Sequence, residues 1–443
     1  MIRADRATTI ASLLVAAFLS AIPPAFAQAE SGAVAPQQIT ETEAATVLVE
    51  AGRLEDAKLV LAHVLEANPS DNEARFLRAM IAVADKRYDD AIADFRFILA
   101  AEPNRERVRL ELARAFFLAA DYENAERNFR FARAGDLSPA VKANIDQFLA
   151  AILRLKRWSY DVGLALAQDT NVNGATSVNL INLYGLPFTL SDDARQKSGA
   201  GVAIDVGGEW SPLLADDVKA KFGGHVHRLE YEGSAFDDMT LSAYAGPEFL
   251  LPRWQIDTLL TGFRRWYGNT PYNQGVGGRA AVDFALLTGV QLGSALDVQA
   301  VSYRLVKEQD GTVISGNLDA TYTISPSSLV RLVGGIGFQT AKLQALANTT
   351  RWIALDFYQD LPWGFSANIE PAFSWTRYHA QIPAFGVTRD DHLWAARLDL
   401  LNRRVEYRGF APRLSFIYTS QTSTISLYRY SRMQVQIGLT RQF

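Results

Sequence analysis

A repeat of 34 residues in the first third of the chain constrains the fold more than any other feature of the sequence. A small residue recurs where two helices would cross, a bulky residue recurs one turn later, and a proline closes the unit. The recurring residues are Leu54, Tyr88 and Tyr122; Ala57, Ala91 and Ala125; Leu61, Phe95 and Phe129; and Pro69 and Pro103. This pattern is typical of tetratricopeptide repeats and predicts an α-solenoid.

The repeat and its flanking residues predict three helix pairs at about 41–68, 72–102 and 105–134. A seventh helix begins at Ser138 and Pro139, because a capping serine is followed by a proline at the first helical position. Because the same class of side chain recurs at each repeat position of this chain, these residues are predicted to form the core of the solenoid. The polar residues of the first helix of each pair are predicted to line a concave face.

A secretory signal peptide is predicted for residues 1–27. Arg3 and Arg6 precede an apolar run that is too short to cross a bilayer comfortably, and Ala25 and Ala27 frame a cleavage site of small residues. The chain has no Cys, which excludes disulfides, thiol catalysis and thiolate metal sites. This composition suits a protein that is exported into an oxidising periplasm.

From Trp158 onward the apolar pattern changes from a helical period to a period of two. In 364–376, Phe, Ile and Trp side chains alternate with Ser, Asn and Glu side chains, and 218–227 and 408–419 alternate in the same way. All eight Trp and 14 of the 16 Tyr lie after residue 157, which indicates aromatic girdles at two membrane interfaces. These features predict a transmembrane β-barrel.

About 14 strands are predicted, and their even number agrees with an outer-membrane barrel. The segments are 158–169, 198–210, 217–229, 238–250, 253–266, 274–288, 290–305, 312–324, 328–339, 350–361, 363–376, 389–402, 408–420 and 430–443. Tight turns are expected at 251–252, 288–289, 325–327 and 361–362, and longer connections at 170–197, 340–349 and 377–388. In the last strand, Val435, Ile437, Leu439 and Phe443 are expected to share the lipid-facing side.

The predicted fold class is therefore a tetratricopeptide-type α-solenoid followed by an antiparallel outer-membrane β-barrel. Residues 28–40 form a flexible N-terminus, 41–157 a helical domain in the periplasm, and 158–443 the barrel in the outer membrane. The formal net charge is −4, and neither half of the chain dominates it. No basic patch indicates nucleic-acid binding, and a near-neutral barrel predicts weak steering of charged solutes.

Candidate catalytic groups are sparse. His225 and His227 share one strand face and could bind a metal or act as a base, but the sequence places no third ligand near them. The run from Asp390 to His392 resembles the acid and histidine pair of a hydrolase, although contact with water at a loop boundary explains it as well. No phosphate-binding loop, dinucleotide fingerprint or nucleophile elbow occurs in a suitable context. We therefore predict no enzyme activity, no cofactor and no metal.

Asp169, Asn171 and Asn173 form a polar trio on one face, where the first strand leaves the membrane. Three oxygens at this spacing could hold a calcium ion. They could instead organise the long loop that follows or contact a passenger protein.

The segment that starts at Trp158 and contains Gly163 and the same polar trio is similar to the start of the barrel in a known family, the surface lipoprotein assembly modifiers. We name Trp158, Gly163, Asp169, Asn171 and Asn173 the first-strand motif. The order of domains over nearly the whole mature chain resembles this family too. The resemblance implies that lipoproteins, or related secreted proteins, pass through the barrel to the cell surface.

The class of repeat predicts that the concave face of the solenoid binds an extended or partly folded polypeptide, and the candidate residues on its first helices are Arg75, Arg78, Arg109 and Arg114. The resemblance implies that the repeats lie in the periplasm. The expected partners are a surface lipoprotein or secreted protein, outer-membrane lipids and periplasmic chaperones. Two alternatives remain open, namely a polysaccharide-export porin with a tetratricopeptide scaffold and a passive porin. A strongly basic pore would favour export of an acidic polysaccharide.

Overall fold

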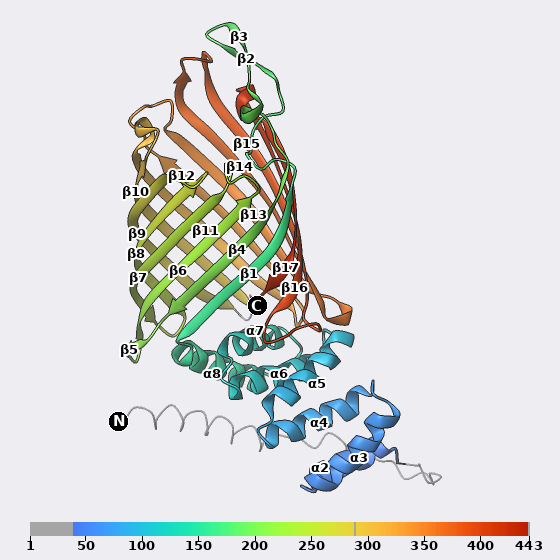
Figure 1. Ribbon diagram of the computed structural model, residues 1–443. Coiled ribbons are helices and arrows are strands. Elements are labelled where there is room, and N and C mark those ends of the chain that lie inside the picture. Colours follow the sequence, from blue (N-terminus) through green and yellow to red (C-terminus); the bar gives the residue numbers. More distant parts are fainter. Residues whose placement is uncertain (1–38, 288, 442–443) are drawn as a thin grey trace. The chain divides into compact units, whose positions relative to one another are not determined.

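The computed structural model describes residues 39–287 and 289–441 (Figure 1). The predicted signal peptide, the predicted flexible segment up to residue 38 and Phe443 lie outside these residues. The chain divides into two compact units. The first consists mainly of α-helices and the second mainly of antiparallel β-strands.

Seven α-helices occur among the described residues, and they agree with the three predicted pairs and the seventh helix. They are α2 (Glu41–Glu50), α3 (Leu54–Ala67), α4 (Asn72–Ala84), α5 (Tyr88–Ala101), α6 (Glu106–Leu118), α7 (Tyr122–Arg133) and α8 (Pro139–Leu155). None of these described helices combines the length and the apolar character that a membrane span requires.

The 34-residue repeat forms the core of the helical unit. Ala57, Ala91 and Ala125 are completely buried at the crossings within each pair. The bulky residues one turn later, which are Leu61, Phe95 and Phe129, are buried as well. Phe129 of α7 stacks on Phe148 of α8 with 4.8 Å between the ring centroids. The repeated residues therefore hold the helix pairs together by close packing.

Local side-chain contacts fix where these helices begin. The Asp71 carboxylate accepts hydrogen bonds from the backbone N–H groups of Glu73 and Ala74 at the start of α4. At the start of α8, Ser138 Oγ accepts a hydrogen bond from the N–H of Val141, which confirms the predicted cap. Such caps satisfy backbone donors that the helix itself leaves unpaired.

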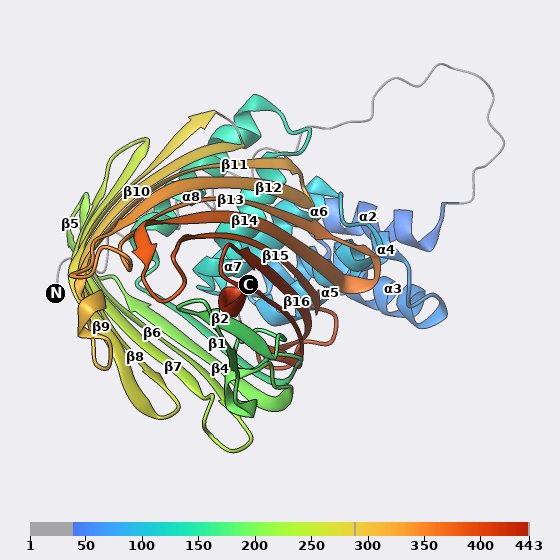
Figure 2. The same ribbon diagram turned by 90° about the horizontal axis from the view of Figure 1, so that it is seen from above.

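The second unit is a closed antiparallel barrel, seen as a ring of strands in Figure 2. Fourteen strands pair in chain order and close through β1 with β17 and β4 with β6, while the short β5 (Leu213–Ala215) pairs only with β6. The barrel strands are β1 (Trp158–Asp169), β4 (Gly199–Trp210), β6 (Val218–Tyr231), β7 (Asp238–Leu250), β8 (Trp254–Tyr267), β9 (Thr270–Leu287), β10 (Val290–Tyr303), β11 (Gly311–Ser325), β12 (Ser328–Gln339), β13 (Asn348–Asp360), β14 (Phe365–Ile382), β15 (Val387–Asn402), β16 (Ala411–Ser423) and β17 (Tyr430–Thr440).

Each barrel strand presents apolar side chains on its outer face. Leu166 of β1, Leu318 of β11 and Ile437 of β17 have exposed fractions of 70%, 70% and 64%. An antiparallel sheet in water would bury such residues, whereas a barrel in a bilayer exposes them to lipid. The alternation predicted for β6, β14 and β16 is confirmed.

The strand connections differ between the two ends of the barrel. The end at which β1 begins carries the predicted tight turns after β7, β9, β11 and β13. The opposite end carries the segment between β1 and β4, which includes the small hairpin of β2 (Leu180–Leu183) and β3 (Leu186–Thr189). The prediction of a long loop at 377–388 is wrong, because β14 and β15 continue as a paired hairpin as far as Ile382 and Val387.

Aromatic residues line the outer wall at the end with the tight turns. Trp158, Trp210 and Phe222 stack across β1, β4 and β6, with ring centroids 5.8 Å and 5.5 Å apart. Trp254 and Phe284 stack at 4.2 Å further around the same end. Their position near one end of the outer wall is that of an aromatic girdle at a membrane interface.

A smaller set of aromatic residues points into the barrel, which the sequence analysis did not foresee. The Trp352 ring lies against Gly335 of the neighbouring strand, so a Cβ at Gly335 would lie 2.2 Å from Trp352 Cζ2. Tyr244 covers Gly223 in the same way, and Phe263 covers Gly275. Glycine is required at these positions because the neighbouring ring occupies the space of a side chain.

Candidate functional site

The inward face of the barrel is the first candidate functional surface, and the strand register defines it. Residues that are directly paired on neighbouring strands lie on the same face of the sheet. Following these pairs around the ring assigns Asp205 of β4 and Asp169 of β1 to the same, inward face. The inward carboxylates of the described strands are Asp161, Asp169, Asp205, Glu209, Asp238, Glu248, Asp257, Asp283, Asp297, Asp319, Asp356, Asp360, Glu370, Asp391 and Asp399. The inward cations are Lys219, Lys221, Arg265, Arg279, Arg331, Arg389, Arg397, Arg413 and Arg432.

Carboxylates therefore outnumber Lys and Arg on this face, although the chain as a whole carries a net charge of only −4. The expectation of a near-neutral barrel does not hold for its interior. Sequence totals could not reveal this excess, because they add the lumenal charges to those of loops and helices. An acidic interior favours cations over anions.

The charge pairing changes along the barrel axis. Toward the end with the longer connections, single arginines pair with single carboxylates, as in Arg265 with Asp238 at 2.5 Å. Toward the tight turns, Asp283, Asp356 and Glu370 have no Lys or Arg within salt-bridge distance among the described residues. The uncompensated negative charge is thus concentrated near the end at which β1 begins.

One lysine at this acidic end lies within salt-bridge distance of three carboxylates. Lys221 Nζ lies 3.1 Å from Asp257 Oδ2, 3.4 Å from Glu248 Oε1 and 3.7 Å from Glu209 Oε2. The Tyr244 hydroxyl donates a hydrogen bond to Glu209 Oε2 at 2.7 Å. Hydrogen bonds and a shared cation stabilise these carboxylates, but they do not remove the excess negative charge.

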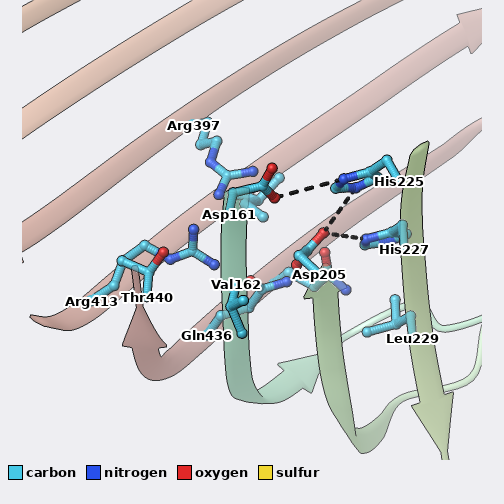
Figure 3. Close-up of a pocket in the computed structure, with 13 residues that line it drawn as sticks. Asp161, Val162, Asp205, His225, His227, Leu229, Arg397, Arg413, Gln436 and Thr440 are labelled. Carbon is cyan, nitrogen blue, oxygen red and sulfur yellow. Dashed lines mark hydrogen bonds and ion pairs between the residues drawn. The ribbon is translucent and has the colours of Figure 1, made fainter. Parts of the chain in front are cut away.

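A cavity of about 380 Å³ opens on the inward face beside the first and last strands (Figure 3). Asp161 and Asp205 point toward His225 and His227, while Arg397 and Arg413 approach from the other side in this view. Arg413 forms no salt bridge with a described residue. The cavity is therefore polarised between a wall with carboxylates and histidines and a wall with guanidinium groups.

The two histidines of this cavity have carboxylate neighbours. His227 Nδ1 lies 2.7 Å from Asp205 Oδ1, and His225 Nδ1 lies 3.7 Å from Asp161 Oδ2. The sequence analysis placed both histidines on one face, which is confirmed, but it did not identify the acids opposite them. No group of three or more His, Cys, Asp or Glu within the described ranges has the arrangement of a metal site.

The first-strand motif begins with Trp158 on the outer wall and Gly163 on the inner wall. Asp169, at the end of β1, is completely buried. Its Oδ2 accepts hydrogen bonds from Arg432 Nη2 at 2.6 Å and from the Tyr231 hydroxyl at 2.5 Å. Gln434 donates to the same hydroxyl at 3.1 Å. The network joins β1, β6 and β17 around the closure of the barrel.

The two asparagines of the motif fix the root of the segment between β1 and β4. Asn171 Nδ2 donates to the carbonyls of Ala175 and Ser431, and its Oδ1 accepts from the N–H of Ala175. Asn173 Nδ2 donates to the carbonyl of Arg195, and its Oδ1 accepts from the N–H of Lys197. The side-chain oxygens thus face hydrogen-bond donors, which favours the loop-organising role over the calcium alternative.

The run Asp390 to His392 lies inside β15, not at a loop boundary. Asp391 faces inward, is buried and pairs with Arg389 at 2.6 Å. His392 lies on the opposite face with Asp390, 3.3 Å from its Oδ1. Asp391 is therefore separated from His392, and the acid and histidine that do lie together, Asp390 and His392, are on the outer face of the barrel.

The arginines predicted to bind a passenger have partners within the helical unit. Arg75 and Arg78 of α4 both pair with the buried Asp94 of α5, at 2.8 Å and 2.6 Å. Arg114 pairs with Glu111 at 2.7 Å, and Arg109 donates to Asn128 at 3.3 Å. The Arg78 side chain is 44% exposed, whereas those of Arg75 and Arg114 are 16% and 11% exposed.

The closed ring, the apolar outer face and the polar inner face define a transmembrane barrel of the outer-membrane class, preceded by helical repeats. The model of the Surface lipoprotein assembly modifier family matches residues 158–443, which is more than half of the chain. The chain belongs to this family, as the sequence resemblance implied. Surface lipoprotein assembly modifiers are not enzymes, which agrees with the prediction of no enzyme activity.

Curated relatives agree with this membership. Surface lipoprotein assembly modifier 2 of Haemophilus influenzae is 23% identical over 312 residues, which cover 68% of this chain and 63% of the relative. The Surface lipoprotein assembly modifier of Pasteurella multocida is 20% identical over 334 residues, which cover 70% of this chain and 65% of the relative. The chain thus spans less than two thirds of the length of these relatives.

Solved outer-membrane channels show only a distant likeness. A FadL homologue of Pseudomonas aeruginosa gives a TM-score of 0.37 at 9% identity, covering 72% of this chain and 93% of that one. OmpF of Salmonella typhi gives a TM-score of 0.36 at 10% identity, covering 65% and 97%. Such scores are too low to relate the chain to any one channel.

Proposed function

We propose that this protein moves a surface lipoprotein, or a related secreted protein, across the outer membrane through its barrel. The observation that carries the proposal is a closed barrel with a polar, acidic inner face in a member of the surface lipoprotein assembly modifier family. Polar walls suit the passage of a hydrated polypeptide, because its backbone groups keep hydrogen-bond partners throughout.

The helical repeats face the periplasm in this proposal. The tight turns at the end where β1 begins support it, because outer-membrane barrels have short periplasmic turns and longer outer loops. Only Lys156 and Arg157 separate α8 from β1 along the chain, and this short connection supports the same proposal. A passenger held by the repeats would have a high effective concentration at the barrel.

Capture of the passenger by the helical repeats is supported by the repeat class, since such solenoids present extended binding surfaces. Among the four predicted arginines, Arg78 is the best candidate to contact a passenger directly, because almost half of its side chain is exposed. Arg75, Arg109 and Arg114 would instead support the binding surface through Asp94, Asn128 and Glu111. Periplasmic chaperones would deliver the passenger in an unfolded state.

The acidic lumen argues against export of an acidic polysaccharide, which is the main competing function. Uncompensated carboxylates such as Asp283, Asp356 and Glu370 would repel a polyanion at the end where it would have to enter. A passive porin would need no helical repeats. Neither alternative is favoured by an observation of its own.

The proposal is tested by deletion of the gene followed by protease shaving of intact cells. We expect one or more surface lipoproteins to become resistant to the protease while their total amount is unchanged. Complementation with the wild-type protein should restore digestion. Display that is identical with and without the gene for every surface lipoprotein would contradict the proposal.

A further inference from the structure

A second cavity, of about 180 Å³, lies on the barrel at the end opposite the tight turns. Arg264 of β8, Gln274 of β9 and Ser302 of β10 are paired across the strands and lie on the lipid-facing side. Arg304 and Lys307 follow β10 and complete the cationic part of the wall. The cations of the cavity therefore lie on the lipid-facing side of the barrel wall, whereas Asn273 and Tyr303, which also line it, belong to the same face as the inward Arg265.

The three cations of this cavity are available to a ligand. Arg264, Arg304 and Lys307 are all exposed, and none forms a salt bridge with a residue in the described parts of the chain. Arg264 lies over the ring of Trp266, with 5.1 Å between the guanidinium carbon and the ring centroid. Trp266 belongs to the outer face, where an indole is suited to the membrane interface.

The acids of the same region do not neutralise the cavity. Asp310 accepts a hydrogen bond from the N–H of Tyr303 and pairs with Lys342 at 2.9 Å, and both contacts lower its pKa. Glu308 is the remaining acid beside Lys307, and it does not line the cavity. Lys307 also contributes to lowering the pKa of Asp310, but neither Asp310 nor Glu308 lines the cavity, which therefore keeps a positive wall.

The turn that carries two of these cations is amphipathic. Leu305 and Val306 lie between Arg304 and Lys307 and have exposed fractions of 74% and 42%. Apolar side chains at this level would be stable in the acyl region, while the adjacent cations would lie among headgroups. This arrangement suits a bound lipid better than a soluble anion.

We propose that this cavity binds the phosphate headgroup of a membrane lipid. Arg264, Arg304 and Lys307 would contact the phosphate, and Leu305 and Val306 would contact the acyl chains. The assignment to the outer leaflet rests on the orientation in the proposed function. Headgroup binding itself does not depend on transport of a passenger.

The test is native mass spectrometry of the purified full-length protein in detergent, titrated with bisphosphorylated lipid A. Parallel titrations use dephosphorylated lipid A and inorganic phosphate. We expect saturable binding of the bisphosphorylated lipid, weaker binding of the dephosphorylated lipid and no saturable binding of inorganic phosphate. The triple variant R264Q/R304Q/K307Q should weaken binding of the bisphosphorylated lipid by about tenfold or more.

The matched control is the double variant R351Q/R377Q, which removes two exposed cations from the outer face of β13 and β14, away from the cavity. It should leave lipid binding unchanged, and both variants should keep the heat-dependent gel mobility of a folded barrel. Equal affinities of wild type and triple variant, an equal loss in the control, or equally tight binding of inorganic phosphate would each overturn the proposal. Because the titration contains no passenger, a failure of the transport proposal would leave its result unchanged.

Discussion

Asp169 of β1 and Arg432 of β17 form a buried salt bridge between the first and last strands of the barrel, with Oδ2 and Nη2 2.6 Å apart. The Asp169 side chain is fully buried, and that of Arg432 is 27% exposed. Because Tyr231 of β6 binds the same oxygen, one carboxylate connects three strands. The pair therefore stabilises the closure of the ring near the end with the longer connections.

Breaking this pair should destabilise the barrel strongly. Asp169→Asn leaves Arg432 without a charged partner in a low-dielectric site, and we expect a loss of about 3 kcal/mol in the free energy of unfolding. Urea unfolding, followed by the heat-dependent gel mobility, measures the loss. Asp193→Asn is the control, because Asp193 pairs with Lys197 at an exposed site. Equal stability of the D169N variant and wild type would exclude a structural role for the pair.

The glycine under Trp352 provides a test of which face points inward. In Gly335→Ala the new methyl group would overlap the Trp352 ring, and we expect a loss of about 1–3 kcal/mol. Gly334, one residue earlier, faces the other way, and a Cβ there would meet its nearest atom at 3.8 Å. Gly334→Ala should therefore leave the urea midpoint unchanged. If the two variants were equally stable, the assignment of the faces would be wrong.

The excess of inward carboxylates predicts cation selectivity. In planar bilayers under a KCl gradient, any current through the barrel should reverse at a potential that favours K⁺ over Cl⁻. The variant D356N/E370Q removes two inward carboxylates without a cation partner and should shift the reversal potential toward zero. Asp390→Asn, on the lipid-facing side of β15, should not shift it. An anion-selective wild type would contradict the electrostatic account.

Asp94 should be a stability residue of the helical unit. It is buried and pairs with both Arg75 and Arg78, so Asp94→Asn removes a charge that two guanidinium groups share. We expect a loss of about 2 kcal/mol, seen as faster hydrogen exchange across α4 and α5. Asp90→Asn is the control, since the Asp90 side chain is 63% exposed and, among the described residues, forms a salt bridge with Arg87 alone. Unchanged hydrogen exchange in the D94N variant would show that the salt bridges of Asp94 with Arg75 and Arg78 do not stabilise the helical unit.

The overall architecture could be predicted from the sequence because periodicity reports directly on burial. Ala57 and its equivalents are identical and Leu61 and its equivalents are all bulky, and both sets are buried in the helical core. The barrel strands were recognised because lipid demands an apolar residue at every second position. The hairpin of β14 and β15 continues through part of the segment 377–388, which was predicted to be a loop. Side chains there, such as Arg377 and His379, are polar, so the alternation that indicates a strand is lost.

The contents of the sites could not be predicted in the same way. The partners of Asp169 are 62 and 263 residues away along the chain, so only the closed register brings Tyr231 and Arg432 to it. The acidic lumen likewise depends on which face each charge occupies. The pairing of Arg75 and Arg78 with Asp94 follows from the packing of α4 against α5, which a repeat pattern alone does not specify.

Passage of a polypeptide through the lumen is the central claim, and adjacent residues of β11 allow it to be tested directly. Asn317 faces inward and Leu318 faces lipid. A photoreactive amino acid placed at 317 should crosslink to a lipoprotein passenger during its transport, whereas the same amino acid at 318 should crosslink only to lipid or membrane neighbours. Passenger crosslinks at 318 but not at 317 would contradict transport through the barrel.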